Sequence, residues 1–344
     1  MRQAKDIALA WIQANGPSFA GFEGAFFHGS INCLNDDDSL PPSSDVDIYL
    51  VSSADPLPRP PRKLMYQGVV LEISTRSINA LSDPQEILRD HKLAGTFSRD
   101  SVAVDITGQL RRLNREVAQE YHKRRWVQER CEKSLSVVHE YLNALQRDMA
   151  FYEQVTVLAF GTGNLADLSI VAGLKNPTVR KKYAVAREVL TELQRTELYE
   201  TLLRLFGCAD FTSEQVSHHL DQLSQVFDAA CEVDKPGYRF AGDISASSRA
   251  IAIEGSRELV EAGHHRDAVF WLVATYSRCM AVFDQFGSPE ALTKHRALFD
   301  ELLADLGIDS WEKRLARRNL VQQEIPAIWG ELEKIIDENP LVTD

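Results

Sequence analysis

The chain has 344 residues, more than the ~100 to 200 typical of one domain, so we expect two domains. Its composition, 44% hydrophobic and 26% charged, is close to the average for globular proteins and excludes collagen-like, fibrous and wholly disordered classes. Lys and Arg number 38 against 50 Asp and Glu, and the net charge of −12 argues against a protein that binds nucleic acid by neutralising phosphates over a broad surface.

The sequence predicts a cytoplasmic protein with free thiols. Its most apolar stretches, such as residues 268–274, are interrupted by charge before the ~20 residues that a membrane span needs. The N-terminal residues form an amphipathic pattern without an apolar signal core. The five cysteines are widely spaced and contain no C-x-x-C pair, so we expect buried thiols and infer no zinc site.

The first 110 residues hold nearly all the strand-like runs and alternate them with helix-like pieces. Apolar residues at helical spacing predict a helix over residues 4–14, ended by Asn15-Gly16-Pro17. Runs rich in Val, Ile, Phe or Tyr predict four strands, at 24–27, 45–52, 69–74 and 101–106. The proline-rich residues 55–61 indicate a rigid connection between two strands, because proline fixes φ and lacks the N–H.

From about residue 109 onward the strand signals almost vanish, and apolar residues at i, i+3, i+4 and i+7 predict helices. The expected helices span residues 109–148, 150–173, 177–206, 212–232, 242–262, 265–284, 288–305 and 310–337. They share no fixed repeat period, which favours a bundle over a solenoid. The predicted fold class is therefore α+β: a mixed sheet with helices over residues 1–110, followed by an all-helical domain over residues 111–344.

Two carboxylates separated by one residue stand at the start of the second predicted strand. Successive side chains of a strand alternate faces, so Asp45 and Asp47 share one face while Val46 and Ile48 enter the core. Like charges this close are relieved by a divalent cation bound to oxygen ligands. Glu72 is the one acid in an otherwise apolar strand, where an ionised carboxylate is expensive unless it is paired or binds a metal. Beside the Asp45 strand it would complete three acids around one or two Mg²⁺, the arrangement that clamps oxygens in phosphoryl or nucleotidyl transfer.

A Gly-Ser pair follows the first predicted strand. Gly29 permits a close approach of the backbone, and Ser30 can cap a helix whose free N–H groups bind a phosphate. The preceding His28 is interpreted as a packed residue and not as a catalyst, because nothing in the sequence supplies it with a partner.

The order of these features resembles the nucleotidyltransferase superfamily, which has the DNA polymerase beta-like fold. The resemblance lies in a strand followed by Gly29-Ser30, a strand that begins Ser44-Asp45-Val46-Asp47, and a later strand with a lone acid. Residues 104–110 resemble the strand and Asp-x-x-Gly turn that often close this domain. A single N-terminal catalytic domain followed by helices is similar to the antibiotic nucleotidyltransferases that modify kanamycin or streptomycin. The resemblance covers about the first 125 residues, and the helical remainder matches only in kind.

The resemblance implies an enzyme that transfers a nucleoside monophosphate, AMP from ATP, to a hydroxyl of a small-molecule acceptor such as an aminoglycoside-like antibiotic. It implies that Gly29 and Ser30 hold the triphosphate and that Asp45 and Asp47 bind Mg²⁺. Glu72 would be either a third metal ligand or the base for the acceptor hydroxyl. These three acids are then the expected catalytic and metal-binding residues.

The loop between Ser30 and Asp45 departs from the family pattern. It is slightly long, contains Asp36-Asp37-Asp38 and lacks the Arg or Lys common there. The charge of the phosphates must therefore be met by the metal and by bases elsewhere in the chain.

Two features of the predicted helical domain are candidates for substrate binding. Residues 175–183 are basic and stand at a predicted helix start, so Lys181 and Lys182 are candidate nucleotide-binding residues; the alternative is an exposed basic face. The helix with Glu129, Glu132 and Glu140 is expected to line a cleft that attracts a cationic or polyhydroxylated acceptor.

Other interpretations stay open at this point. Asp45 and Asp47 could be solvated residues at a strand end while Glu72 pairs with a Lys or Arg. The protein could also modify or bind a protein partner, as antitoxins of this superfamily do, or be a catalytically inactive nucleotide-binding scaffold. The expected partners are a nucleoside triphosphate and a small-molecule acceptor, with no nucleic acid and no membrane, and a homodimer is left open.

Overall fold

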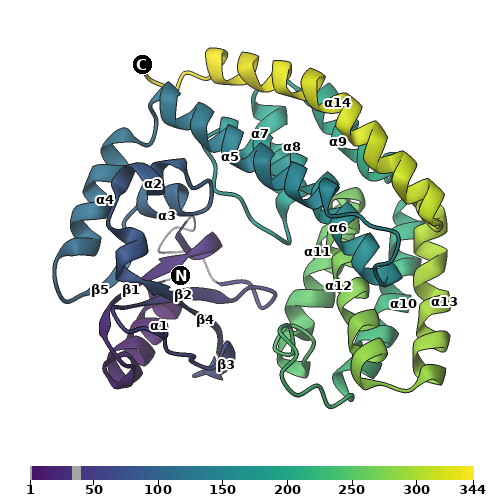
Figure 1. The fold of residues 1–344 in the computed structure, drawn as a ribbon, viewed down its shortest axis with the longest axis horizontal. Coiled ribbons are helices and arrows are strands. Elements are labelled where there is room, and N and C mark those ends of the chain that lie inside the picture. The colour runs from purple at the N-terminus through teal and green to yellow at the C-terminus, as the bar shows by residue number, and fades with distance from the viewer. Residues whose placement is uncertain (1, 33–39) are drawn as a thin grey trace. The chain divides into compact units, whose positions relative to one another are not determined.

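The computed structural model describes residues 2–32 and 40–344, and it has the α+β architecture expected from the sequence (Figure 1). Contacts divide the chain into two compact units. Unit 1 comprises Met1–Lys133, Leu174–Thr178 and Pro340–Asp344, and unit 2 comprises Ser134–Gly173 and Val179–Asn339. The division falls after residue 133, whereas the sequence expectation places it after residue 110, so helix α4 (Gln109–Glu120) and the first half of α5 (Arg124–Asn143) group with the sheet.

Unit 1 is built on a five-stranded mixed sheet with the strand order β3-β4-β2-β1-β5. The strands are β1 (Phe22–His28), β2 (Val46–Ser52), β3 (Lys63–Tyr66), β4 (Val69–Ser77) and β5 (Val102–Asp105). Strand β4 runs parallel to β2, and the other neighbouring pairs are antiparallel. The parallel pair places the beginnings of β2 and β4 side by side, which is where the acidic residues stand.

Strand β3 is absent from the sequence prediction. It forms a hairpin with β4 through Gln67 and Gly68, both of which have positive φ, +47° and +81°. Two-residue hairpin turns of this kind are usually marked by Asn-Gly or Asp-Gly. The turn here carries Gln in place of Asn, so the hairpin signal is weak.

The sheet has two faces with separate cores, because side chains alternate along each strand. Helix α1 (Arg2–Asn15) covers one face, which buries Phe27, Ile48 and Ile73. Helices α2 (Pro84–Arg89), α3 (Leu93–Phe97) and α4 (Gln109–Glu120) pack on the other face. Asp47 and Glu72 alternate with the residues packed on α1 and therefore belong to the second face.

The helices of the remaining chain lie within or close to the predicted segments, but the predicted helices 109–148 and 150–173 are each divided in two, and within 242–262 the α-helix covers only Gly255–Glu261. They are α5 (Arg124–Asn143), α6 (Phe151–Gly163), α7 (Leu165–Ala172), α8 (Lys182–Glu192), α9 (Thr196–Phe206), α10 (Ser213–Cys231), α11 (Gly255–Glu261), α12 (His265–Phe286), α13 (Pro289–Asp305) and α14 (Trp311–Glu338). The predicted helix 177–206 is interrupted between α8 and α9, where Gln194 has a φ of +56°. A left-handed residue cannot continue an α-helix, and the sequence gives no Gly or Pro to mark it.

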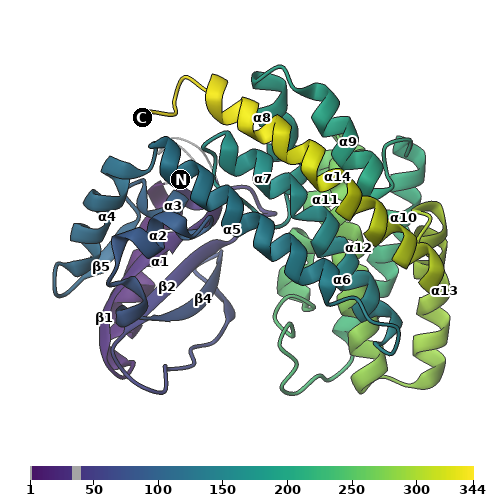
Figure 2. The same ribbon diagram turned by 45° about the horizontal axis from the view of Figure 1, so that its top comes forward.

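The centre of unit 2 is helix α12, which packs against α6, α10 and α13 (Figure 1 and Figure 2). Its side chains are buried on nearly every side from Asp267 to Phe283. Trp271, Tyr276 and Phe283 are part of this core. A helix that is apolar all round is typical of the middle of a bundle.

One helical stretch of the described residues, Phe151–Ala172, is long and apolar enough to cross a membrane by length and composition alone. A helix over residues 150–173 was predicted from the sequence, but its apolar length was not recognised, although its two charges, Glu153 and Asp167, are widely separated. In the structure 83% of its most apolar window is buried. Core helices of soluble proteins pass the same test, so the stretch is weak evidence for a membrane span.

Four of the five cysteines lie in the described residues, and all four are free thiols. Cys131, Cys208 and Cys279 are buried, and Cys231 is partly buried. Burial raises the pKa of the Cys131 thiol to about 12. Cys33 lies outside the described residues.

Candidate functional site

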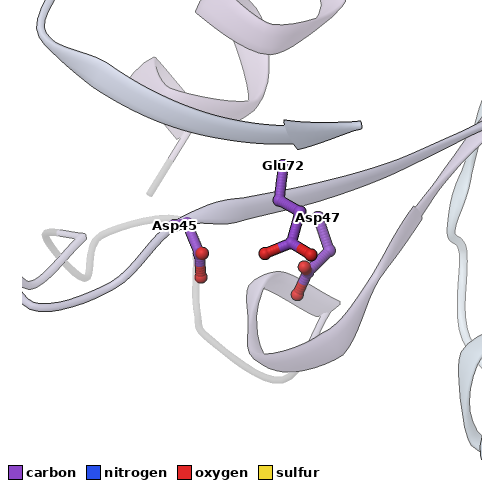
Figure 3. A group of neighbouring side chains, drawn as sticks. All are labelled: Asp45, Asp47 and Glu72. Carbon is purple, nitrogen blue, oxygen red and sulfur yellow. The ribbon is translucent and has the colours of Figure 1, made fainter. Parts of the chain in front are cut away.

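The three acids singled out from the sequence lie together where β2 and β4 begin (Figure 3). Asp45 directly precedes β2, Asp47 lies in β2, and the parallel register places Glu72 of β4 beside Asp47. One carboxylate oxygen of each residue lies within 4.8 Å of the others. The prediction that these acids meet on one face of the sheet is confirmed. We call Asp45, Asp47 and Glu72 the acid group.

Glu72 is less enclosed than its apolar strand suggests. Its side chain is 22% exposed, although the neighbouring Leu71 and Ile73 are buried in the core under α1. The buried cluster on the face of Glu72 draws its residues from β1, β2, β5 and the helices, and β4 contributes none of its described members. The expectation of an acid inside a fully buried strand was therefore wrong, because the Glu72 side chain is partly exposed although Val70, on the same face of β4, is buried.

Two basic residues that sequence reasoning missed contact the acid group. The ammonium of Lys63 lies 3.0 Å from Asp45 Oδ2 and 3.1 Å from Glu72 Oε2, and its side chain is only 6% exposed. Arg62 Nη2 lies 3.6 Å from Glu72 Oε1. Lys63 is the residue of β3 directly opposite Glu72 in the antiparallel register. The short apolar run Leu64-Met65-Tyr66 before a Gln-Gly turn was a weak signal for this hairpin, and recognising it would have placed Lys63 opposite Glu72.

These contacts agree in part with the alternative interpretation of the acids. Glu72 does pair with a Lys and an Arg. Asp45, however, shares the ammonium of Lys63 and is 20% exposed, so it is not a freely solvated strand end. The acid group therefore carries basic partners within its own sheet.

Gly29 is placed where a side chain would collide with the acid group. Its φ is +70°, and a Cβ added there would lie 2.4 Å from Asp47 Oδ2. The backbone of the Gly-Ser turn therefore approaches the carboxylate more closely than any other residue type allows. The close approach that Gly29 allows is to Asp47 in this structure, and its role in holding a triphosphate stays a prediction.

Residues Gly29–Asn32 form a four-residue 3₁₀ turn after β1, and residues 33–39 that follow lie outside the described part of the chain. Asn32 Nδ2 donates a hydrogen bond to the carbonyl of Phe27 at 2.8 Å, which folds the turn back onto the end of β1. Ser30 is exposed, and the expectation that it caps a helix stays a prediction beyond Asn32. Asp36-Asp37-Asp38 of the following loop lie outside the described residues.

His28 is packed, as interpreted from the sequence. Its Nδ1 lies 2.6 Å from Thr96 Oγ1, and its ring meets Tyr49 edge-on with centroids 5.4 Å apart. Burial lowers the pKa of His28 to about 4, although the nearby Asp90 raises it. The imidazole is therefore neutral at pH 7.

Lys181 and Lys182 belong to unit 2. Lys182 is buried there, with its ammonium 3.0 Å from Asp167 Oδ2 and 2.5 Å from Asn164 Oδ1. The alternative of an exposed basic face is thus wrong for Lys182. Burial lowers the pKa of Lys181, and the neighbouring Arg180 lowers it further. A role for either lysine in nucleotide binding stays a prediction.

Glu129, which we expected to line an anionic cleft, has its charge neutralised locally. Its carboxylate accepts hydrogen bonds from Arg89 at 2.6 Å and from Arg125 at 2.8 Å. A carboxylate with two guanidinium partners contributes little attraction to a cationic acceptor.

No protein-family model matches this chain, and no curated protein matches it. The function must therefore be argued from the acid group itself.

Proposed function

We propose that this protein is a Mg²⁺-dependent nucleotidyltransferase that moves AMP from ATP to a hydroxyl of a small-molecule acceptor. The observation that carries the proposal is the meeting of three carboxylates on adjacent strands, with oxygens within 4.8 Å of one another. The resemblance of Gly29-Ser30 and Ser44-Asp45-Val46-Asp47 to nucleotidyltransferase motifs supports it. Gly29 lies against Asp47, which links the two motifs in one site.

The donor set fits a hard divalent cation. All three donors are carboxylates, the ligands that Mg²⁺ prefers, and all are partly exposed. Asp45, Asp47 and Glu72 would hold the ion, which when bound would neutralise phosphate charge and stabilise the negative charge of the transferring phosphoryl group.

The residues of the chain would supply positioning and proton transfer. The acceptor oxygen forms a bond to the α-phosphorus of ATP, the bond from that phosphorus to the β-bridging oxygen breaks, and pyrophosphate leaves. Glu72 would accept the proton of the acceptor hydroxyl or, alternatively, act only as a metal ligand. The Gly29-Ser30 turn would hold the triphosphate against the acids, so that attack occurs in line.

The acceptor is proposed to be small, with aminoglycoside-like antibiotics as the first candidates. The net charge of −12 favours a cationic or neutral acceptor over a polyanion such as RNA. The large helical unit 2 gives the chain much more than a minimal catalytic domain, which favours a self-contained enzyme. A cytoplasmic location is part of the same proposal.

One observation favours a second candidate, a nucleotidyltransferase-like scaffold that binds a nucleotide or a protein partner without catalysis. Lys63 and Arg62 already pair with the acids, as they would if the acid group were purely structural. Such a protein would still have the fold, but it would not turn over ATP.

An acceptor panel with a Glu72 variant tests the proposal. Purified protein with ATP and Mg²⁺ is assayed for pyrophosphate release with aminoglycosides, lincosamides, simple amino sugars and short RNA. We expect release with at least one small hydroxylated acceptor, and Glu72→Gln should lower it by about two orders of magnitude or more. The control Glu120→Gln, which removes a carboxylate paired with Lys123, should leave the rate unchanged.

Two results would contradict the proposal. Release with RNA alone would exclude the small-molecule acceptor. A Glu72→Gln protein that melts at a lower temperature but keeps its turnover per folded molecule would place Glu72 in a structural ion pair.

A further inference from the structure

We propose that Lys63 is the resident cation of the acid group and opposes divalent metal binding until a triphosphate is present. This inference rests on the proposed function, because it concerns the same site. It gives Lys63 a positioning role: the lysine would make metal and nucleotide bind together and weaken the binding of metal alone.

The geometry places the ammonium of Lys63 where a metal would bind. It lies 3.0 Å from Asp45 Oδ2 and 3.1 Å from Glu72 Oε2, so it bridges two of the three acids. The side chain is 6% exposed, against 20% and 22% for its two partners. The charge is therefore enclosed by the site and does not extend into solvent as lysine ammonium groups usually do.

The backbone fixes this arrangement. Lys63 is the first residue of β3 and faces Glu72 across an antiparallel pair, and the register continues from Leu64 to Tyr66. The strand continues into β4 through a tight turn at Gln67 and Gly68. The stem of Lys63 is thus anchored beside the acids, while its flexible side chain can change partner.

Coulomb repulsion then determines how a metal binds. A divalent ion on the same carboxylates would lie within a few ångströms of the ammonium, where unit charges interact strongly even at an effective dielectric constant of about 20. Metal binding to the free protein must either displace Lys63 or tolerate that repulsion. A triphosphate supplies new oxygen partners for the ammonium, so the repulsion is relieved when nucleotide is bound.

The inference predicts a positive coupling between metal and nucleotide that depends on Lys63. Such coupling is reciprocal: if the nucleotide strengthens metal binding, the metal strengthens nucleotide binding by the same factor. Removing the lysine charge should strengthen the binding of metal alone and weaken the coupling. A residue that only stabilised the sheet would not strengthen metal binding when removed.

The experiment compares wild-type protein with Lys63→Met, Lys63→Gln and Lys63→Arg. Calorimetry measures the affinity for Mn²⁺ alone and for Mn²⁺ in the presence of the α,β-methylene analogue of ATP, which cannot transfer its nucleotidyl group. Lys123→Met is the matched control, because it removes a lysine that pairs with Glu120 at 2.7 Å. Melting temperatures establish that each variant is folded. If Lys63→Met does not fold, the comparison is made with Lys63→Gln.

We expect Lys63→Met and Lys63→Gln to bind Mn²⁺ alone at least tenfold more tightly than wild type, a change of about 1.4 kcal/mol. The analogue should strengthen Mn²⁺ binding markedly in wild type and in Lys63→Arg, and much less in the uncharged variants. Lys123→Met should match wild type.

Folded uncharged variants that bind Mn²⁺ no more tightly than wild type would overturn the inference and leave the proposed function standing. The absence of Mn²⁺ binding from wild type and all variants, with and without the analogue, would instead contradict the proposed function together with this inference.

Discussion

At the level of single residues, the site is a balance between three carboxylates and the bases beside them. Asp47 takes part in three features: it lies in β2, it stands beside Glu72 in the parallel register, and its carboxylate lies against the backbone of Gly29. Lys63 then holds Asp45 and Glu72 from the neighbouring hairpin. Each acid therefore has a defined neighbour, which fixes the geometry offered to a cation.

The first prediction is that His28 makes the stability of the protein depend on pH below neutrality. Burial lowers its folded pKa to about 4 from the ordinary 6.5, so the unfolded chain binds a proton between these values while the folded protein does not. The contribution of His28 to the free energy of unfolding should be complete at pH 7 and should decrease by roughly 2 kcal/mol as the pH falls to 5.

His28→Gln removes this titration and should flatten that part of the stability curve, as measured by denaturant unfolding at both pH values. The exposed His139→Gln is the control. An unchanged pH dependence in His28→Gln would show that the imidazole titrates in the folded protein as it does in the unfolded chain.

The acids could be predicted from the sequence, and their basic partners could not. The i, i+2 spacing of Asp45 and Asp47 places both on one face of any strand, and Glu72 is the one charge in an apolar run. Both are local patterns that the sequence shows. No sequence pattern around Lys63 marks it as a site residue, and it joins the site only through the pairing of β3 with β4. That pairing depends on a Gln-Gly turn, which is a weak hairpin signal.

At the level of elements, the Gly29–Asn32 turn connects the end of β1 to the acid group. The sequence suggested a helix here because Ser can cap one. Over the described residues the chain forms a 3₁₀ turn, in which the side chain of Asn32 donates a hydrogen bond to the carbonyl of Phe27. A side-chain hydrogen bond to the backbone of this kind competes with helix formation.

Gly29→Ala is predicted to damage both stability and metal binding. The substitution places a Cβ 2.4 Å from Asp47 Oδ2 at a φ of +70°, so it adds a clash to the usual strain of a left-handed non-glycine residue. We expect a loss of about 2 kcal/mol or more in the free energy of unfolding. We also expect weaker Mn²⁺ affinity in the folded fraction, because Asp47 must move.

Gly68→Ala is the matched control for this prediction. Gly68 has a φ of +81° but nothing within 4 Å of an added Cβ, so only the backbone strain of about 1 kcal/mol applies. Denaturant unfolding and Mn²⁺ calorimetry on both variants decide the matter. Equal losses of stability and of Mn²⁺ affinity in the two variants would show that the contact between Gly29 and Asp47 adds nothing to the effect of backbone strain.

At the level of the whole molecule, the chain is not two domains in simple succession. Leu174–Thr178 and Pro340–Asp344 belong to unit 1 although they are distant from it in sequence. The last residues pair with the chain at the start of α5: Arg124 N donates to Thr343 O at 2.7 Å and Thr343 N donates to His122 O at 2.9 Å. The sequence predicted the α+β class because strand and helix periodicities separate cleanly along the chain. The sequence could not predict that these two later segments belong to unit 1, because that depends on contacts between residues distant in sequence.

The central claim is that Asp45 and Asp47 bind a metal and, through it, a nucleoside triphosphate. The most direct measurement is calorimetry of ATP binding with and without Mg²⁺ to wild type, Asp45→Ala and Asp47→Ala, with circular dichroism to show that all three are folded. Wild type should bind ATP much more tightly with Mg²⁺, and both variants should lose this dependence while keeping their fold. Equal ATP affinity in wild type and both folded variants, in the presence of Mg²⁺, would contradict the account.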